Sequence, residues 1–382
     1  MTGKRLRLSQ RTPKTAADPE VLQVVEKFVE KSGSQLANGW KLGKQLGRGN
    51  QGAVYLLEDE DGNGAGRVLK LVWNKTKAAI VGGFVLMERE WAIGRRLNLL
   101  NEEDGFLEGF TQTGSKILDK DGSFLGTVLE KLNGKGAKNR LEDPKFNDID
   151  YILEMMTEVL RALDRARSTI GFRHGDMHIR NVMEHRVEEE SGGPELETDK
   201  VSFRVRVNLR GLHFKIIDLG HAEIIEDQAD DYEKIVKKME ADPPELPKLS
   251  PEKVYRAAFV NRDDVWRFVR SVSQYLGVRV WHEEDKLKVQ LLLSIIKEIT
   301  GNIHRAHFAM SNKAGEAKRT SCEKAMSVGG TCFTFKWFNV NIHAYFFPGR
   351  PTITPREALD FIEKRKKELG LTDRELHVSK QV

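Results

Sequence analysis

The sequence has few of the features that define several protein classes. Its two cysteines, Cys322 and Cys332, have neither metal-ligand nor disulfide spacing, which argues against a disulfide framework and fits a reducing setting. No stretch approaches the roughly 20 apolar residues of a membrane span. The first fourteen residues lack the apolar core of a signal peptide. We therefore expect an intracellular protein, cytoplasmic, nuclear or both, with no membrane span.

An excess of one charge is also missing. The 382 residues include 62 Lys and Arg against 57 Asp and Glu, a formal net charge of +5. This balance does not indicate specific nucleic-acid binding. Basic residues gather in the first nineteen positions, where a targeting segment and a disordered tail are both open readings and composition favours the tail. With 39% hydrophobic residues, the chain can bury a sizeable core.

Short apolar strands come first and helices dominate later. Strand-like patterns cover 40–46, 53–57, 68–72 and 125–132, and one helical pattern covers 85–100. Helices are then predicted at 148–167 (with Asn147 or Asp148 as cap), 230–240, 263–276, 285–299 and 355–369, the last beginning with a Thr354–Glu357 capping box. This order predicts an α+β fold with a small β-rich lobe before a larger helical lobe.

The predicted lobes have definite boundaries. We expect a basic tail over 1–38, with room for a lead-in helix, a first lobe over 39–132 and a second lobe over 133–370. A C-terminal tail covers 371–382. An insertion at about 184–211, an acidic loop followed by a strand pair, interrupts the second lobe, and its sequence assigns it no role.

A glycine-rich segment lies between the first two predicted strands. Gly47, Gly49 and Gly52 would let backbone N–H groups approach phosphate oxygens without interference from Cβ atoms. Alone, such a segment is more often a simple hairpin turn. Strands on both sides favour a phosphate-covering hairpin over a dinucleotide-binding turn, which precedes a helix.

Lys70 lies in the middle of an apolar strand, where a buried ammonium needs a partner. Snorkelling at a sheet edge would be an equally common explanation. The next helix offers a partner, because Glu90 falls on its apolar face, whereas Glu88 points roughly 200° away. We predict a Lys70–Glu90 ion pair that holds Lys70 toward the α- and β-phosphates of a nucleotide.

The most specific segment, His174–Asn181, follows the long predicted helix. Asp176 can accept or orient a hydroxyl proton, and Asn181 can bind Mg²⁺ through its amide oxygen. Further on, an apolar strand leads to Asp218 in an Asp-Leu-Gly turn, where a carboxylate is well placed to bind Mg²⁺ that bridges phosphates. In this order the segments predict phosphotransfer from ATP.

With these motifs the chain resembles the eukaryotic protein kinase superfamily, over about residues 40 to 369. The resemblance implies a two-lobed kinase-like fold, use of ATP and Mg²⁺, and transfer of the γ-phosphate to serine or threonine of a protein substrate. It implies the catalytic residues Asp176, Asn181, Lys70 and Glu90, the metal ligands Asn181 and Asp218, the ATP-binding residues Gly47, Gly49, Gly52, Val54, Lys70, Glu130 and Leu132, and Leu129 as gatekeeper.

Three later segments favour a protein substrate by the same resemblance. Ser250–Glu252 is similar to the Ala-Pro-Glu of protein kinases, and Asp264–Trp266 to the motif that opens their central helix. Arg350 is placed like the arginine that pairs with that glutamate. Small-molecule kinases of similar fold generally lack this region.

Two departures leave the substrate class open. Gly175 stands where most protein kinases have an arginine, so control through phosphorylation of the activation loop is not expected. His178 replaces a lysine and gives the His-Gly-Asp-x-His pattern shared by haspin-like protein kinases and by aminoglycoside and choline kinases. A small-molecule kinase is therefore the alternative enzyme, and an ATP-binding pseudokinase scaffold is the alternative from another class. The sequence does not indicate an oligomeric state.

Overall fold

The chain folds as two compact units. Unit 1 comprises Met1–Arg95 and Gln112–Lys131, and unit 2 comprises Arg96–Thr111 and Leu132–Val382. The computed structural model describes residues 23–25, 35–36, 40–48, 52–59, 61–62, 64–72, 83–103, 109–119, 121–122, 124–187, 196–199, 204–224, 262–276, 279–304, 306–309 and 349–371. Gly49, the segment Ser250–Glu252 and the helix predicted at 230–240 lie outside these residues.

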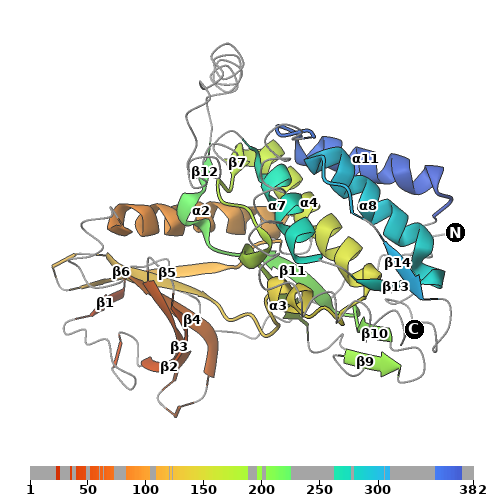
Figure 1. Cartoon of the computed structure of the whole chain (residues 1–382). Coiled ribbons are helices and arrows are strands. Elements are labelled where there is room, and N and C mark those ends of the chain that lie inside the picture. Colours follow the sequence, from red (N-terminus) through yellow and green to blue (C-terminus); the bar gives the residue numbers. More distant parts are fainter. Residues whose placement is uncertain are drawn as a thin grey trace, which may run out of the picture. The chain divides into compact units, whose positions relative to one another are not determined.

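Unit 1 contains a six-stranded sheet (Figure 1). Its strands are β1 (Gln23–Val25), β2 (Lys41–Arg48), β3 (Gly52–Glu58), β4 (Gly64–Val72), β5 (Thr113–Asp119) and β6 (Phe124–Glu130), in the spatial order β1-β5-β6-β4-β3-β2. Helix α2 (Gly83–Glu103) follows β4 along the chain, and its last turns belong to unit 2.

The period-two alternation in the sequence explains the core of unit 1. In β3, Ala53, Tyr55 and Leu57 are buried while the residues between them are partly exposed. These three pack with Leu42 of β2 and Leu69 of β4 in one cluster. Burying a large apolar side chain stabilises the fold by roughly 1.5–3 kcal/mol. A one-residue slip would expose these side chains, so burial on one face fixes the register of the strands.

The segment 1–38, expected to hold a tail with room for a lead-in helix, contributes a strand. Residues 23–25 form β1, which pairs in parallel with β5 from Gln23 opposite Ile117 to Val25 opposite Asp119. The strand extends the sheet at its β5 edge, where the β-branched Val24 and Val25 suit an extended backbone.

Unit 2 is mainly helical, with short strand pairs at its loops. Its helices are α3 (Ala137–Glu142), α4 (Ile149–Ile170), α7 (Asp264–Leu276), α8 (Lys286–Thr300) and α11 (Pro355–Glu368), with short 3-10 turns η2 (Ile179–Asn181), η3 (Leu219–His221) and η4 (Glu283–Asp285). Its strands pair as β7 (Phe172–Arg173) with β12 (Glu223–Ile224), β8 (Val182–Arg186) with β11 (Leu212–Ile216), β9 (Leu196–Asp199) with β10 (Arg204–Val207), and β13 (Val280–His282) with β14 (His307–Ala309). The predicted α+β class is confirmed.

Helix α4 of unit 2 begins where the helix predicted at 148–167 was expected to begin, and it runs three residues further, to Ile170. The Asp148 carboxylate accepts from the Tyr151 N–H at 3.1 Å as the N-cap, and Gly171 ends the helix in the left-handed region. Helices α8 and α11 pack against α4 (Figure 1). The Thr354–Glu357 capping box predicted for α11 is present.

Two predicted boundaries shift for a physical reason. Residues 96–111 were expected in the first lobe but belong to unit 2. Ile216 of β11 donates its N–H to the Gly109 carbonyl at 2.9 Å and accepts from the Thr111 N–H at 3.1 Å, which ties this segment to unit 2. The insertion was expected to begin at about residue 184. It begins after Arg186, because Glu184 to Arg186 still belong to β8 and pair with β11.

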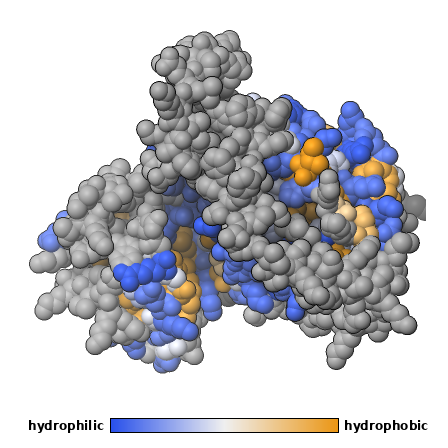
Figure 2. All heavy atoms as spheres, viewed as in Figure 1, coloured by the Kyte–Doolittle hydropathy of each residue, from blue (hydrophilic) through white to orange (hydrophobic). Residues whose placement is uncertain are grey.

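The described surface mixes polar and apolar residues. Large hydrophobic side chains that are exposed among the described residues are Leu46, Leu287 and Ile303. Figure 2 shows hydrophilic residues with smaller hydrophobic areas between them, which is ordinary for a protein surface. Within the described part of the chain, none of the helices combines the length and apolar composition that crossing a membrane requires.

Candidate active site

The glycine-rich segment of unit 1 joins two antiparallel strands. Gly47 of β2 lies opposite Val54 of β3, and Gly52 begins β3 opposite Val72 of β4. A Cβ atom added at Gly47 would meet nothing within 4 Å among the described atoms. Packing therefore does not require glycine at position 47. The hairpin predicted for this segment is present, with Gly49 outside the described residues.

Lys70 and Glu90 form the ion pair predicted from the sequence. The Lys70 Nζ lies 2.8 Å from both carboxylate oxygens of Glu90, and the two side chains are 13% and 8% exposed. Strand β4 supplies the lysine from its centre, between Val54 of β3 and Thr127 of β6. Glu88 instead reaches Lys116 at 3.0 Å and is half exposed, as its different helical phase predicts. The choice of Glu90 over Glu88 is thus correct.

The end of β6 has a constrained backbone. The Glu130 N–H donates to the Gln112 carbonyl at 2.9 Å, and the Lys131 N–H donates to the Gly66 carbonyl at 3.0 Å. Both N–H groups are therefore bonded to carbonyls of unit 1. These two bonds do not involve the N–H group of Leu132, the next residue.

In unit 2, Asp176 lies in the segment His174–Asn181, called here the 174–181 loop. His178 Nε2 lies 3.5 Å from Asp176 Oδ2, and both side chains are partly exposed. Burial alone would raise the pKa of Asp176, but the hydrogen bond and charge of His178, with further histidines nearby, lower it below its ordinary value. Asp176 is therefore a carboxylate at neutral pH.

Asn181 and Asp218 are neighbours although they lie far apart in the sequence. The β8–β11 pairing ends at Ile216, and the next N–H, that of Ile217, donates to the Asn181 carbonyl at 2.9 Å. Asp218 follows directly. The Asn181 amide group donates from Nδ2 to the Asp176 carbonyl at 3.1 Å, which directs its Oδ1 away from that carbonyl. The main chain just before Asp218 is therefore bonded to Asn181, whose side chain is bonded to the main chain of Asp176.

Asp218 has an unusual backbone conformation. Its φ of 62° and ψ of 70° lie in the left-handed region, and it has the one positive φ among the described residues other than glycine. A non-glycine residue held there costs of order 1–3 kcal/mol, and such residues concentrate at functional sites. The strained carboxylate at position 218 therefore adds a structural signal to the sequence motif.

Gly175 is required by the backbone. Its φ is +74°, and an added Cβ atom would lie 2.5 Å from the carbonyl oxygen of His221. His221 ends the turn that follows Asp218. The 174–181 loop and the Asp218 turn are therefore in direct contact at a point where only glycine fits.

A polar stripe of α7 lies along the 174–181 loop. Asp264 accepts from the N–H groups of His174 and Gly175 at 2.6 and 2.9 Å. Ser271 Oγ accepts from the Ile179 N–H at 2.8 Å. The remaining members of the stripe are Arg267, which donates to the Gly175 carbonyl, and Tyr275, whose hydroxyl accepts from Arg180. One helix thus holds the loop from end to end.

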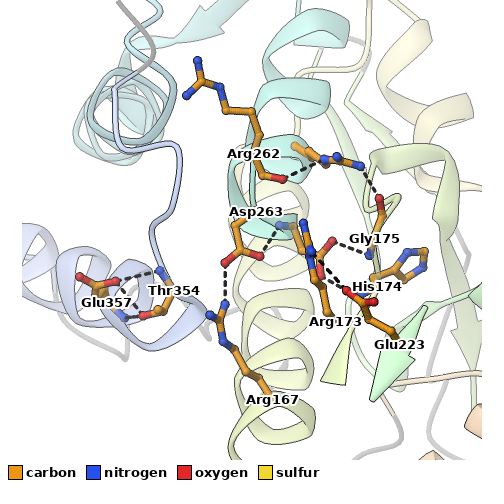
Figure 3. A network of polar contacts seen from close by, with 11 residues as sticks. Arg167, Arg173, His174, Gly175, Glu223, Arg262, Asp263, Thr354 and Glu357 are labelled. Atoms are coloured by element: carbon orange, nitrogen blue, oxygen red, sulfur yellow. Dashed lines mark hydrogen bonds and ion pairs between the residues drawn. The ribbon is translucent and has the colours of Figure 1, made fainter. Parts of the chain in front are cut away.

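The stripe continues into a wider network at the start of α7 (Figure 3). Arg167 of α4 pairs with the buried Asp263 at 2.6 Å, and Arg173 pairs with Glu223 across β7 and β12 at 3.2 Å. Burial raises the pKa of Asp264, against the charge of His174. Burial lowers the pKa of Arg267, opposed by the nearby Asp264.

Asp264–Trp266 was predicted to open a helix, which is correct, and Trp266 is fully buried. The contacts of α7 with the 174–181 loop were not predicted. Asp264, Arg267, Ser271 and Tyr275 follow a three- and four-residue spacing along α7. That spacing was the available signal, because such residues share one face. Arg350 pairs with Glu357 at 2.8 Å, while Glu252 lies outside the described residues.

The donor set of unit 2 fits a hard cation. Asn181 and Asp218 offer only oxygen ligands, the type that Mg²⁺ prefers. Within the described ranges, no group of three or more His, Cys, Asp or Glu side chains could hold a metal ion. Mg²⁺ typically takes one or two protein ligands and completes its coordination with water and substrate phosphates. The pair therefore suits Mg²⁺ that arrives with a nucleotide.

No protein-family model and no curated protein matches the chain. The crystal structure of the kinase domain of PF14_0431 is similar to it at 16% identity and a TM-score of 0.40, covering 72% of this chain and 74% of that one. The PknI kinase domain of Mycobacterium tuberculosis is similar at 22% identity and a TM-score of 0.31, covering 41% and 58%. Vaccinia related kinase 3 is similar at 17% identity and a TM-score of 0.35, covering 51% and 53%.

Proposed function

We propose that this chain is an ATP- and Mg²⁺-dependent protein kinase that transfers the γ-phosphate to serine or threonine hydroxyls. The observation that carries the proposal lies in unit 2, where the Asn181 side chain donates to the Asp176 carbonyl and the Asn181 carbonyl accepts from Ile217, the residue before the strained Asp218. Residues that lie far apart in the sequence are brought together there by the β8–β11 pairing. The Lys70–Glu90 pair of unit 1 adds an independent phosphate-binding group.

In unit 2, Asp176 orients the attacking hydroxyl and accepts its proton as the phosphoryl group is transferred. Its lowered pKa keeps the carboxylate ready for this role at neutral pH. Asn181 Oδ1 and the Asp218 carboxylate are the protein ligands for Mg²⁺, with Asn181 oriented by its bond to the Asp176 carbonyl. Bound Mg²⁺ would neutralise phosphate oxygens and orient the γ-phosphate.

In unit 1, Lys70 binds the α- and β-phosphates, and Glu90 orients the ammonium for that contact. The backbone of Gly47, Gly49 and Gly52 covers the phosphates, and Val54 lies in the strand that follows. For adenine, we assign the carbonyl of Glu130. We also assign the Leu132 N–H to adenine, because the Glu130 and Lys131 N–H groups are bonded to carbonyls of unit 1.

The test is a phosphate-transfer assay with radiolabelled ATP and Mg²⁺ on panels of peptides, proteins and small molecules. Wild type should label a peptide or protein, and Asp176→Ala should lose about 10²- to 10⁴-fold of that activity. Arg356→Ala is the matched control, because Arg356 lies on the exposed side of unit 2 in a pair with Asp164. Equal inactivity of wild type and Asp176→Ala on every substrate would reject the catalytic assignment.

A small-molecule kinase is the second candidate, and the contact between His178 and Asp176 is compatible with it as well as with a protein kinase. The His-Gly-Asp-x-His pattern is shared with aminoglycoside and choline kinases, where small alcohols accept the phosphate. Asp176-dependent labelling of an aminoglycoside, choline or a sugar, with no labelled protein, would reverse the order of the two candidates. Thermal stabilisation by ATP with Mg²⁺, without transfer to any substrate, would instead favour an ATP-binding pseudokinase scaffold.

A further inference from the structure

Glycine directly before Asp176 creates a positioning problem. Glycine has more backbone freedom than any other residue, so a carboxylate that follows it is free to turn with the preceding peptide. Position 175 cannot carry a larger residue, because an added Cβ would lie 2.5 Å from the His221 carbonyl oxygen at a φ of +74°. No side chain at 175 can therefore fix the loop, and another group must supply that restraint.

Arg267 of α7 supplies a restraint at this peptide. Its guanidinium donates from one terminal nitrogen to the Gly175 carbonyl and from Nε to the Arg262 carbonyl at 3.0 Å (Figure 3). The planar guanidinium presents its donors in a fixed fork, so two carbonyls bound at once fix its orientation. Arg262 directly precedes the buried Asp263, which Arg167 holds from α4. The fork is thus anchored to the packed interior of unit 2.

The opposite side of Gly175 is held as well. The Gly175 N–H donates to Asp264 at 2.9 Å, and the His174 N–H donates to the same carboxylate at 2.6 Å. Asp264 and Arg267 lie one turn apart on α7, so one rigid helix holds both the N–H and the carbonyl of Gly175. Fixing both groups removes the freedom of both backbone dihedrals of the glycine.

We infer that Arg267 is a positioning residue for Asp176, acting through the Gly175 carbonyl. The inference rests on the proposed phosphotransfer function and adds a residue that touches neither nucleotide nor acceptor. The peptide that Arg267 holds carries Asp176 at its other end, so a shift of this peptide displaces the carboxylate. A displacement of about 1 Å of a catalytic group can cost on the order of a hundredfold in rate. Nucleotide binding by Lys70 in unit 1 does not depend on this contact.

The kinetic test compares Arg267→Met and Arg267→Lys with wild type and the Arg356→Ala control. Methionine keeps much of the side-chain length and loses every donor, so kcat per folded enzyme should fall about 10- to 100-fold while KM for ATP stays within about twofold. Lysine keeps a charged donor without the fork, so Arg267→Lys should retain more activity than Arg267→Met. Arg356→Ala should match wild type. An unchanged kcat per folded Arg267→Met enzyme would overturn the inference.

Amide hydrogen exchange separates this inference from the proposed function. In Arg267→Met, exchange at Gly175 and Asp176 should speed up by about tenfold or more, while the amides in the middle of α4 keep their protection. This result is expected even if wild type proves to transfer no phosphate. Unchanged exchange at Gly175 would overturn the inference on its own. If Arg267→Met does not fold, Arg267→Lys carries both measurements, with a drop in kcat of about three- to tenfold expected.

Discussion

Glu90 in unit 1 and Asp264 in unit 2 are buried carboxylates held by different means. In unit 1, Glu90 receives the Lys70 ammonium on both oxygens at 2.8 Å, a contact between two side chains. In unit 2, Asp264 receives the backbone N–H groups of His174 and Gly175. Asp148 likewise accepts from the Tyr151 and Val207 N–H groups at 3.1 and 2.7 Å. Of these three carboxylates, Glu90 depends on a mutable side-chain partner, whereas Asp264 and Asp148 accept from the main chain.

This difference separates two kinds of vulnerability. A side-chain partner disappears with one substitution, whereas a backbone N–H remains unless the chain changes its path. The contact of Glu90 should therefore be lost when the charge of its partner is removed. The contacts of Asp264 should be lost when a substitution changes the backbone path, above all at Gly175. Three predictions follow this division, from the largest expected effect to the smallest.

The largest effect is expected in unit 1. Lys70→Met should lower kcat/KM for ATP-dependent transfer by about 10²- to 10³-fold, because it removes a charged donor from the phosphates and leaves the buried Glu90 without its ammonium. Steady-state kinetics with the transfer assay measure this. Glu88→Gln is the matched control, since Glu88 pairs with Lys116 on the exposed side of α2 and should change activity less than twofold. A Lys70→Met enzyme with wild-type kcat/KM would remove unit 1 from the mechanism.

The second prediction concerns a carboxylate held by the main chain. Burial raises the pKa of Asp148 from 3.8 to about 6, although N–H bonds from Val207 and Tyr151 oppose the shift. The folded chain thus keeps this proton at pH values where the unfolded chain has lost it. The stability that Asp148 contributes is fully present below pH 3.8 and is lost as the pH rises through about 6.

The interval between these pKa values corresponds to about 3 kcal/mol. Asp148→Asn keeps a good N-cap and does not titrate, so its free energy of unfolding should lose this share of the pH dependence. Urea unfolding of wild type and variant at about pH 4 and about pH 7.5 measures the difference. Parallel pH profiles for the two proteins would show that burial does not hold a proton on Asp148.

The third prediction compares one glycine from each unit. Gly62 in unit 1 and Gly175 in unit 2 have φ values of +81° and +74°, but an added Cβ meets nothing within 4 Å at Gly62 and the His221 carbonyl at 2.5 Å at Gly175. Gly62→Ala should cost about 1 kcal/mol, for the left-handed backbone alone. Gly175→Ala should cost about 2 kcal/mol more, from the clash with a main-chain atom. Urea unfolding measures both free energies. An equal loss of stability in the two variants would mean that the Asp218 turn moves away from the added methyl group at little cost.

Local patterns in the sequence were enough to predict much of the site. Helical phase separated Glu90 from Glu88, and strand alternation placed Lys70 among apolar residues. Cap chemistry predicted the start of α4 at Asn147 or Asp148, of which Asp148 is the cap, and the Thr354–Glu357 box of α11. These features depend on neighbours within about one or two turns, which is why a single sequence carries them.

Long-range pairing lies beyond local patterns. The parallel pairing of β1 with β5 joins segments far apart in the sequence, so the sequence of β1 alone could not show it. The Gly175 position was noted only as the loss of an arginine. That glycine is required there depends on where the His221 carbonyl lies, a fact of tertiary structure. The contact of Arg267 with the 174–181 loop has the same origin.

The two ends of the insertion are hydrogen-bonded neighbours, so the residues between them can change in number and sequence. Strand β8 leaves the pair at Arg186 and β11 enters it at Leu212, and the Val187 N–H donates to the Gly211 carbonyl at 2.9 Å. The entropy cost of closing a loop grows only slowly with its length. Evolution or a protein engineer could therefore shorten, lengthen or replace the 188–210 segment without moving Asn181 or Asp218. Such an exchange would also remove contacts with the rest of unit 2, because the Val205 N–H reaches Asn147, the Val207 N–H reaches Asp148 and the Asn208 carbonyl accepts from Arg186.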